Sequence, residues 1–309
     1  MKKVNLGPRL IELNKVQKWT SLLLCILIFA VVAGLVLLVK INIWFLPVVF
    51  LLISGIQVHL SILLHEGAHY NLHPDKKVNE FISDLFAAAP LASLTKFYRA
   101  LHLTHHRYTS CEELDPERSF FRSLGFTYQK MSKAQVFKML AMDLCGYNVI
   151  RGAVWMNTFT KGLQQKKKLE QVNRMNGLAY LLFYGCWGVF FSYMDFLLGS
   201  LICWFLPLFT LSFCLIKLHS HGEHYFPTTD NEFERTFTRE YNVITNFFIY
   251  PLNSGLHLEH HLYPTVPWYN QRKLKTALMQ DPTYKIGAER ATLSGYFLGK
   301  QSSLRELLK

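Results

Sequence analysis

Four long apolar segments constrain this chain more than any other feature of its sequence. Each approaches or exceeds the length that an α-helix needs to cross a bilayer, roughly 20 residues, and half of the 309 residues are hydrophobic. Because a backbone in lipid must satisfy its own hydrogen bonds, we expect these segments to be helices. The predicted spans are residues 19–39, 43–64, 177–193 and 196–218.

The predicted spans form two pairs. Residues 40–42 join the first pair and residues 194–195 join the second, and such short connections predict helical hairpins. The first 18 residues carry five Lys and Arg against one Glu, so the positive-inside bias places both termini and the long middle stretch in the cytoplasm. No small-residue cleavage site follows the first span, which should therefore remain as an anchor. The expected fold is an all-α, multi-pass integral membrane protein, with residues 1–309 as one domain.

Residues 81–94 and 134–155 are apolar but short or interrupted, which predicts helices lying at the membrane interface.

Other features of the composition exclude several classes of protein. The six cysteines are scattered without a CxxC pair, so neither a disulfide framework nor a zinc knuckle is expected. Lys and Arg give a net charge of +12, but they are dispersed around apolar segments. This pattern favours cytoplasmic loops over nucleic-acid binding.

Short histidine motifs carry the candidate chemistry. They read HxxxH, HxxHH, HxxH and HxxHH, and positions i, i+3 and i+4 share one face of a helix. With 13 histidines in the chain, a given HxxHH is expected by chance roughly 0.02 times in this length. The candidate metal ligands are His65, His69, His102, His105, His106, His221, His224, His257, His260 and His261.

The number of these histidines predicts two metal ions. In the four-span topology all four motifs fall on the cytoplasmic side. A zinc site takes three or four protein ligands, whereas eight histidines plus one or both of His221 and His224 are available here. Imidazole binds iron, zinc, copper and nickel alike. The scarcity of cysteine and carboxylate ligands argues only against iron–sulfur clusters and calcium.

The order of the motifs resembles that of the membrane fatty acid desaturase and hydroxylase superfamily, over roughly residues 40–275. Three further segments are similar to the corresponding segments of the bacterial acyl-lipid branch. They are the pairs Tyr98-Arg99 and Asp115-Pro116 and the run from His257 to Trp268. Cytochrome-fused front-end desaturases differ, because their third box begins with Gln where this chain has His257. No haem-binding His-Pro-Gly-Gly motif occurs here either.

This resemblance implies a non-haem di-iron centre that uses O₂ to remove hydrogen from an unactivated C–H bond. The eight histidines of the three boxes are the implied ligands, with His224 as the ninth, while His221 could hold a water or replace it. The implied enzyme is a fatty acid desaturase acting on a lipid or acyl chain. Hydroxylases and ketolases of lipids or carotenoids share comparable boxes and remain an alternative. The chain has no recognisable haem, flavin or iron–sulfur motif, so a separate ferredoxin or cytochrome is expected to donate electrons.

Two further classes have weaker support. The sequence from His65 to His69 also fits HExxH, in which Glu66 would be the general base of an intramembrane zinc protease. The two HxxHH boxes have no role in such a single-zinc enzyme. A metal transporter would need a polar path, but the spans carry few polar residues besides Gln57 and His59.

Residues near the boxes receive supporting roles. His59, His73 and His219 break the ligand spacing or lie within a span, so we expect them to be hydrogen-bonded, solvated or behind the ligands. Trp268 and Tyr269 are interpreted as interfacial anchors in preference to substrate-lining residues. A metal-bound histidine usually donates its other N–H to a carboxylate or carbonyl. The candidate carboxylates are Glu66, Asp84, Asp115, Glu223, Asp230 and Glu259.

Overall fold

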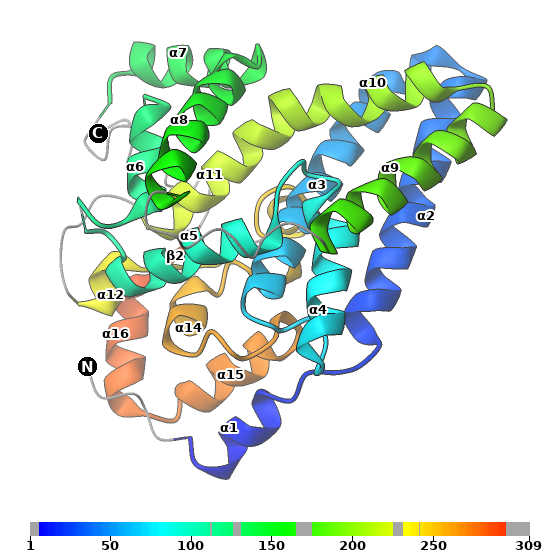
Figure 1. The fold of residues 1–309 in the computed structure, drawn as a ribbon. Coiled ribbons are helices and arrows are strands. Elements are labelled where there is room, and N and C mark those ends of the chain that lie inside the picture. Colours follow the sequence, from blue (N-terminus) through cyan, green and yellow to red (C-terminus); the bar gives the residue numbers. More distant parts are fainter. Residues whose placement is uncertain are drawn as a thin grey trace.

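The computed structural model describes residues 6–111, 113–125, 131–164, 175–224, 231–240 and 242–294. Helices dominate this part of the chain (Figure 1). The only strands among the described residues are β1 (Thr238–Glu240) and β2 (Thr292–Ser294), which pair in parallel. The prediction of an all-α protein is therefore confirmed, with a small two-stranded addition.

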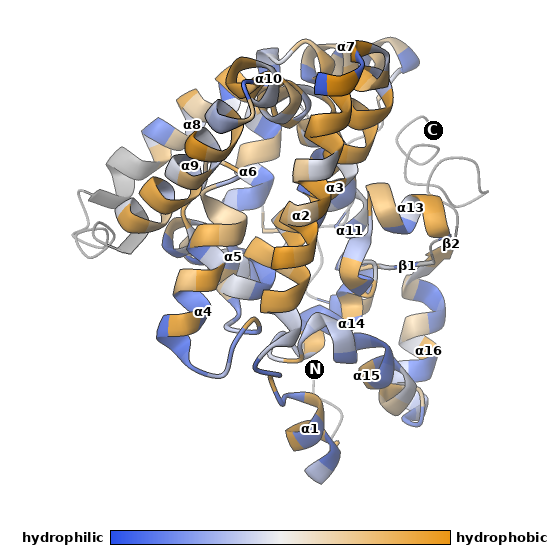
Figure 2. Cartoon of the chain, turned by 90° about the vertical axis from the view of Figure 1, so that its right-hand side faces the viewer, coloured by the Kyte–Doolittle hydropathy of each residue, from blue (hydrophilic) through white to orange (hydrophobic). Residues whose placement is uncertain are grey.

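Three described helices are long and apolar enough to cross a membrane. They are α2 (Thr20–Ile41), the helix Ile43–Ala68 and the helix Leu197–Glu223. The second joins η1 (Ile43–Phe45) to α3 (Leu46–Ala68), and the third joins α10 (Leu197–Pro207), the π-helical turn η3 (Leu208–Ser212) and α11 (Phe213–Glu223). α9 (Met175–Tyr193) contains a shorter apolar helix, Gly177–Tyr193. Figure 2 shows that these helices are predominantly hydrophobic.

The apolar helices pack in the order that the short connections predict. α2 contacts α3, and α9 contacts α10. The Lys40 ammonium donates a hydrogen bond to the Met194 carbonyl, so the two connections meet at the same end of the bundle. Gln57, fully buried in α3, donates to the Trp204 carbonyl at 2.8 Å and accepts from the Ser212 hydroxyl at 2.5 Å. This polar residue of the second apolar helix therefore ties that helix to the third.

The stretch 81–94 does not lie on the surface, so its prediction as an interfacial helix is wrong. α4 (Lys76–Ser83) runs into the π-helical turn η2 (Asp84–Ala88), which packs against α3 and α9. Beyond this turn the Ala89 carbonyl accepts from the Tyr184 hydroxyl, and the Pro90 carbonyl accepts from the Trp204 indole, each at 2.9 Å. Backbone acceptors satisfied in this way can be buried inside the bundle.

The stretch 134–155 forms parts of two helices, neither of which is among the three of membrane-crossing length. They are α7 (Lys133–Leu144) and α8 (Tyr147–Gln164), and they follow α5 (Thr95–Tyr108) and α6 (Pro116–Ser123). Phe137, Ile150 and Val154 are exposed on this pair, as the interfacial prediction requires. On the inner side, a buried ion pair between Asp143 and Lys217 ties α7 to α11.

Most of the remaining short helices gather at the histidine-bearing end of the bundle, opposite the Lys40–Met194 contact (Figure 1), whereas α13 (Val243–Phe248) packs against the middle of α3. A buried apolar cluster that includes Leu13, Leu258, Leu274 and Tyr284 holds several of them together. The short third-box helix α14 is thereby packed from more than one side. These helices are α1 (Pro8–Leu13), α12 (Glu232–Arg235), α13 (Val243–Phe248), η4 (Pro251–Asn253), α14 (His257–Leu262), η5 (Trp268–Asn270), α15 (Gln271–Leu278) and α16 (Pro282–Ala291).

Gly67 permits a close approach of α3 to α4, and this contact generates the first prediction. A Cβ at position 67 would collide with the Ser83 hydroxyl and lie 2.6 Å from the Ser83 Cβ. Gly67→Ala should therefore destabilise the protein by about 1–3 kcal/mol through overpacking. Gly34→Ala in α2, where a Cβ meets nothing within 4 Å, should be neutral or stabilising by up to about 1 kcal/mol. Unfolding of the two variants in detergent checks this, and equal stabilities would contradict it.

Candidate metal centre

The end of α3 brings the first motif onto the helix that carries the second. His65 lies in the last turn of α3 and His69 caps it. The last carbonyls of a helix have no partner within it, and here Arg99 of α5 supplies one. Its Nε donates to the Ala68 carbonyl at 2.8 Å, and a terminal nitrogen donates to the Gly67 carbonyl at 2.7 Å. The α3 terminus is thus fastened to α5.

Each HxxHH box divides its histidines between two groups. On α5, His102 and His106 are four residues apart and face one group, while His105 faces the other. On α14 the division is reversed, because His257 and His261 share the second group and His260 alone joins the first. Each box therefore contributes to both groups, which places the groups side by side.

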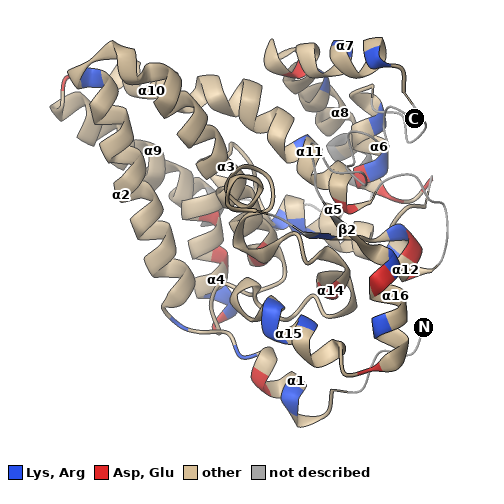
Figure 3. Ribbon diagram, turned by 180° about the vertical axis from the view of Figure 1, so that it is seen from behind, with Lys and Arg blue, Asp and Glu red and all other residues tan. Residues whose placement is uncertain are grey.

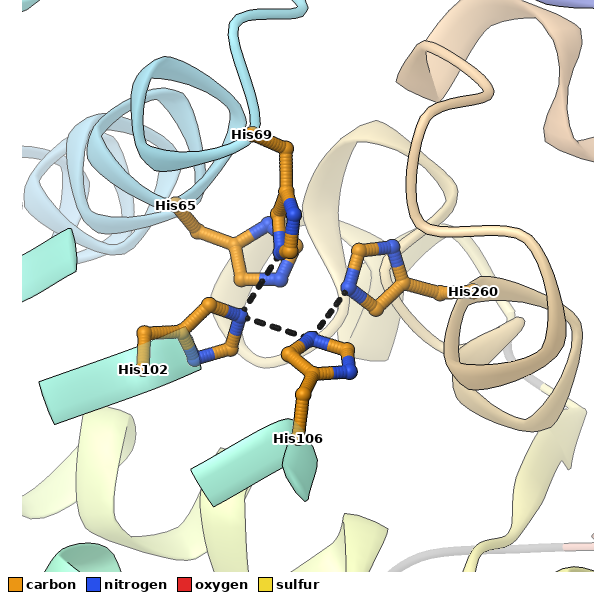
Figure 4. A group of neighbouring side chains, drawn as sticks. All are labelled: His65, His69, His102, His106 and His260. Atoms are coloured by element: carbon orange, nitrogen blue, oxygen red, sulfur yellow. Dashed lines mark hydrogen bonds between the residues drawn. The ribbon is translucent and has the colours of Figure 1, made fainter. Parts of the chain in front are cut away.

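The first group contains five histidines (Figure 4). Their rings point toward a common centre from α3, α5 and α14. The Nε2 atom of His102 is 2.9 Å from that of His69 and 3.0 Å from that of His106, which is 3.1 Å from that of His260. One ligand atom from each histidine lies within 4.8 Å of all the others. The members are His65, His69, His102, His106 and His260.

The second group contains four histidines and includes the residue expected as the ninth ligand. The Nε2 atom of His224 is 3.1 Å from that of His105 and 2.8 Å from that of His257. His221 is also buried, but it belongs to neither group in the described part of the chain. The members are His105, His224, His257 and His261.

The spacing of these nitrogens fits metal coordination. An imidazole nitrogen lies about 2.1 Å from a divalent ion such as zinc, so two such ligands at right angles are about 3.0 Å apart. The observed Nε2 separations run from 2.8 to 3.1 Å. The Nε2 atoms of His65 and His261 are buried and have no hydrogen-bond partner among the described residues. The donor set is imidazole alone, which iron, zinc, copper and nickel all accept.

Burial keeps most of these imidazoles in the neutral form that binds metals. Desolvation, followed by the neighbouring histidines, holds the pKa of His102, His106 and His261 well below the usual range. His105 is the exception. Burial also lowers its pKa, but the Glu117 and Asp115 carboxylates outweigh that effect and raise it to about 9.

Two buried carboxylates contact the Nδ1 atoms of candidate ligand rings and orient them. His105 Nδ1 donates to Asp115 Oδ1 at 3.0 Å, and Asp115 also caps α6. His257 Nδ1 contacts Glu223 Oε1 at 2.8 Å. In both cases an N–H at Nδ1 leaves Nε2 free to bind a metal. Asp115 and Glu223 therefore have the orienting role that the sequence predicts.

The remaining predicted carboxylates differ in their contacts. Glu66 Oε1 lies 3.3 Å from His65 Nδ1, but His65 Nδ1 has no hydrogen-bond partner among the described residues. Glu259 turns away and accepts from the hydroxyls of Thr238 and Tyr284 at 2.6 and 2.7 Å, so it anchors α14 to β1 and α16. Asp84 accepts weakly from the Thr95 amide at 3.4 Å. Asp230 lies outside the described residues.

Sequence reasoning missed two carboxylates and a carbonyl. Glu117 Oε2 lies 3.5 Å from His105 Nδ1, and Glu232 Oε1 lies 3.1 Å from His261 Nδ1. The Arg235 carbonyl accepts from His224 Nδ1 at 2.9 Å. Glu117 follows Asp115-Pro116 directly, and that position was the available signal. No motif in the sequence marks Glu232 or Arg235.

The three histidines excluded by spacing lie outside both groups. His59 Nδ1 donates to the Gly55 carbonyl of its own helix at 2.9 Å, and His73 Nδ1 accepts from the Asp75 amide at 3.0 Å. His219 has acceptors at both nitrogens, with the Ile249 carbonyl 2.7 Å from Nδ1 and Glu223 Oε1 2.9 Å from Nε2. His219 thus holds Glu223 in place beside the ligand ring of His257.

A cavity of about 220 Å³ opens beside both histidine groups. Histidines from α3, α5 and α14 contribute to its lining, and Phe120, Phe121 and Trp155 form an aromatic wall. Trp268 also lines this cavity, so its interpretation as an interfacial anchor is wrong. The Tyr269 hydroxyl instead accepts from the Gln17 amide at 2.6 Å, ahead of α2. The two neighbouring aromatics therefore face different surroundings.

The Asp115–His105 contact generates the second prediction. Asp115→Asn keeps an oxygen for the α6 cap but removes the charge behind His105, so metal affinity should fall about 10–100-fold. Asp75→Asn is the matched control, because Asp75 caps α4 in the same way and contacts neither group. Metal titration of both purified variants checks this. Equal affinities for the two would show that the carboxylate does not support the site.

Comparison with known proteins agrees with this geometry. The family model described as Fatty acid desaturase matches residues 42–291, which include both histidine groups. The dihydrorhizobitoxine desaturase of Bradyrhizobium elkanii is 28% identical over 254 residues, covering 79% of this chain and 71% of that protein. The chain therefore belongs to the fatty acid desaturase family and is a membrane enzyme of that family.

Proposed function

We propose that this chain is a di-iron oxidoreductase that uses O₂ to introduce a C=C bond into a lipid or fatty acyl chain. One observation carries the proposal: nine histidines form two groups that could each hold a metal ion, beside a mainly apolar cavity. The proposed ligands are His65, His69, His102, His106 and His260 for one ion, and His105, His224, His257 and His261 for the other.

The chemistry requires a metal because no side chain can oxidise an unactivated C–H bond. Bound iron would supply that oxidising power. In the balanced reaction, a –CH₂–CH₂– unit, O₂, two electrons and two protons give –CH=CH– and two molecules of water. The substrate loses two hydrogens, and the other two electrons come from a separate donor.

The protein's own contribution is to position the substrate. The aromatic wall of Phe120, Phe121 and Trp155 suits an apolar chain, because lipid-like ligands bind in pockets of mainly hydrophobic and aromatic side chains. His65, His102 and other ligand histidines line the same space. A chain held there would present its methylene groups to both metal sites without diffusing, which lowers the entropic part of the barrier.

The alternatives receive less support. The Bradyrhizobium elkanii relative is named as a desaturase, which favours C=C formation over hydroxylation or ketolation of a lipid or carotenoid. In the protease reading Glu66 must be free to activate water. Here its Oε2 accepts from the Trp268 amide at 2.9 Å and its Oε1 contacts His65. Five histidines in its group also exceed the needs of a single zinc ion.

Lipid profiling of a host with and without this chain tests the proposal. Expression in air should yield a product lighter by two hydrogens, and the product should disappear without O₂. His106→Ala and His261→Ala should abolish it, since each removes a ligand from a different group. His73→Ala is the control, because His73 lies outside both groups, and it should retain activity. A hydroxylated or ketone product would favour the hydroxylase or ketolase alternative. An unchanged lipid profile would exclude desaturation, hydroxylation and ketolation of the host's lipids.

We further propose that α9 is a fourth span and that the histidine groups and both termini face the cytoplasm. Its 17-residue apolar core, Gly177–Tyr193, lies at the lower limit of roughly 17–25 residues for a span. The Lys40–Met194 hydrogen bond joins the two short connections at one end of the bundle, as two hairpins require. The histidines lie toward the other ends of α3 and α11.

The electron donor is proposed to be an acidic ferredoxin or cytochrome that docks beside α15. Arg272 and Lys273 are exposed on this helix, while Gln271 at its first position lines the cavity. Figure 3 shows Lys and Arg on α15 and on neighbouring parts of the same end of the molecule. A donor bound there would be separated from the cavity by about one helix, and charge attraction would speed its association.

Charge reversal on α15 generates the fourth prediction. Lys273→Glu should lower turnover with a protein donor about tenfold at low salt and leave turnover with a chemical reductant unchanged. The difference should shrink as salt shortens the Debye length from about 10 Å at 0.1 M to about 3 Å at 1 M. Lys138→Glu makes the same charge change on α7 and should have no such effect. Equal losses in both variants would exclude docking at α15.

A further inference from the structure

Three buried polar atoms of residues that line the cavity have no hydrogen-bond partner among the described residues. They are Ser254 Oγ, Trp268 Nε1 and Gln271 Oε1, and all three residues line the cavity beside the histidine groups. Gln271 is only 3% exposed. Buried polar atoms in proteins are nearly always paired. Three unpaired atoms on one cavity therefore indicate a surface built to pair with a ligand.

The three residues belong to one wall. Asn253, which precedes Ser254, donates from Nδ2 to the Trp268 carbonyl at 3.0 Å and so joins η4 to η5. Gln271 begins α15 directly after η5. The Trp268 amide donates to Glu66, whose other oxygen contacts His65 of the first group. This polar wall, formed by Ser254, Trp268 and Gln271, therefore adjoins a proposed metal site.

Two of the three atoms of the polar wall have a fixed hydrogen-bonding role. Gln271 Nε2 donates to the Val266 carbonyl at 2.7 Å, and rotating the amide would bring two oxygens together, so Oε1 remains a free acceptor. Trp268 Nε1 can only donate, and the Ser254 hydroxyl can do either. A group that satisfies all three must offer both an acceptor and an O–H or N–H donor.

We propose that the polar wall recognises a neutral hydroxyl or amide head group on the substrate. This inference rests on the proposed function and names the substrate class for that same cavity. An ester or thioester carbonyl has no donor and would leave Gln271 Oε1 unpaired, which is unfavourable in a buried site. An ionised carboxylate also lacks a donor and would bring a second negative charge near Glu66.

The opposite character of the aromatic wall completes the site. Phe120 and Trp155, from α6 and α8, stack edge to face with ring centroids 5.2 Å apart. A head group at the polar wall and an apolar chain along the aromatic wall would share the space lined by His102, His257 and other ligand histidines. The distance from head group to reacting carbon would then be set by the protein, and this would determine where the chain is oxidised.

Binding of four probes with the same alkyl chain tests the inference without turnover. They are dodecanamide, dodecanol, methyl dodecanoate and dodecanoate, titrated into the full-length protein without reductant. The amide and the alcohol should bind about five- to tenfold more tightly than the ester and the carboxylate, which corresponds to one net hydrogen bond. Equal affinities, tighter binding of the carboxylate or no binding of any probe would overturn the proposal.

Two substitutions identify the atoms responsible. Ser254→Ala and Trp268→Phe should each reduce the preference to about twofold or less. Ser254→Ala should leave the melting temperature unchanged or higher, because the deleted hydroxyl has no partner among the described residues. Ser123→Ala is the matched control, since that hydroxyl donates to the Phe120 carbonyl at 2.6 Å and lies outside the cavity. A preference that survives both substitutions would mean that these atoms are only hydrated.

The result is separable from the proposed function. If the host makes an O₂-dependent product but the four probes bind equally, the head-group inference fails and the oxidoreductase stands. If the preference is present and no product forms, the polar wall is a binding site and the proposed reaction is wrong.

Discussion

The convergence of nine buried or half-buried imidazoles is the interaction on which the rest of the structure depends. Nitrogens that lie 2.8 to 3.1 Å apart repel one another if each presents a lone pair, unless an ion or a proton lies between them. Depressed pKa values at residues such as His102 and His261 disfavour the imidazolium form. A metal ion bound by each group would remove the repulsion, and the fold brings candidate ligands together from α3, α5, the end of α11 and α14.

The groups behind the imidazoles hold this arrangement in place. Asp115 and Glu223 accept from ligand Nδ1 atoms, and Glu223 is itself held by His219. Glu259 anchors the short third-box helix through the hydroxyls of Thr238 and Tyr284. These carboxylates fix the orientation of rings and helices before any ligand binds. Sites with such support place a substrate more reproducibly than sites carried on unsupported loops.

Local patterns predicted much of this architecture. Three of the four predicted spans coincide with helices long and apolar enough to cross a membrane, and the boxes follow from helical spacing, because both depend on neighbouring residues. The division of each box between two groups could not be predicted, since it depends on how α5 and α14 face each other. Glu232 was missed for the same reason, because it approaches His261 only in the folded chain. Residues 81–94 were misassigned because an apolar stretch suits a membrane interface and a buried turn equally well.

Metal analysis of the purified protein tests the central claim most directly. The two histidine groups predict two iron ions per chain. His69→Ala and His224→Ala remove one ligand from different groups, and each should release the ion of its own group first. The double variant should then lose both ions. One zinc ion and no iron in the wild-type protein would contradict the account. So would single and double variants that all keep their full metal content.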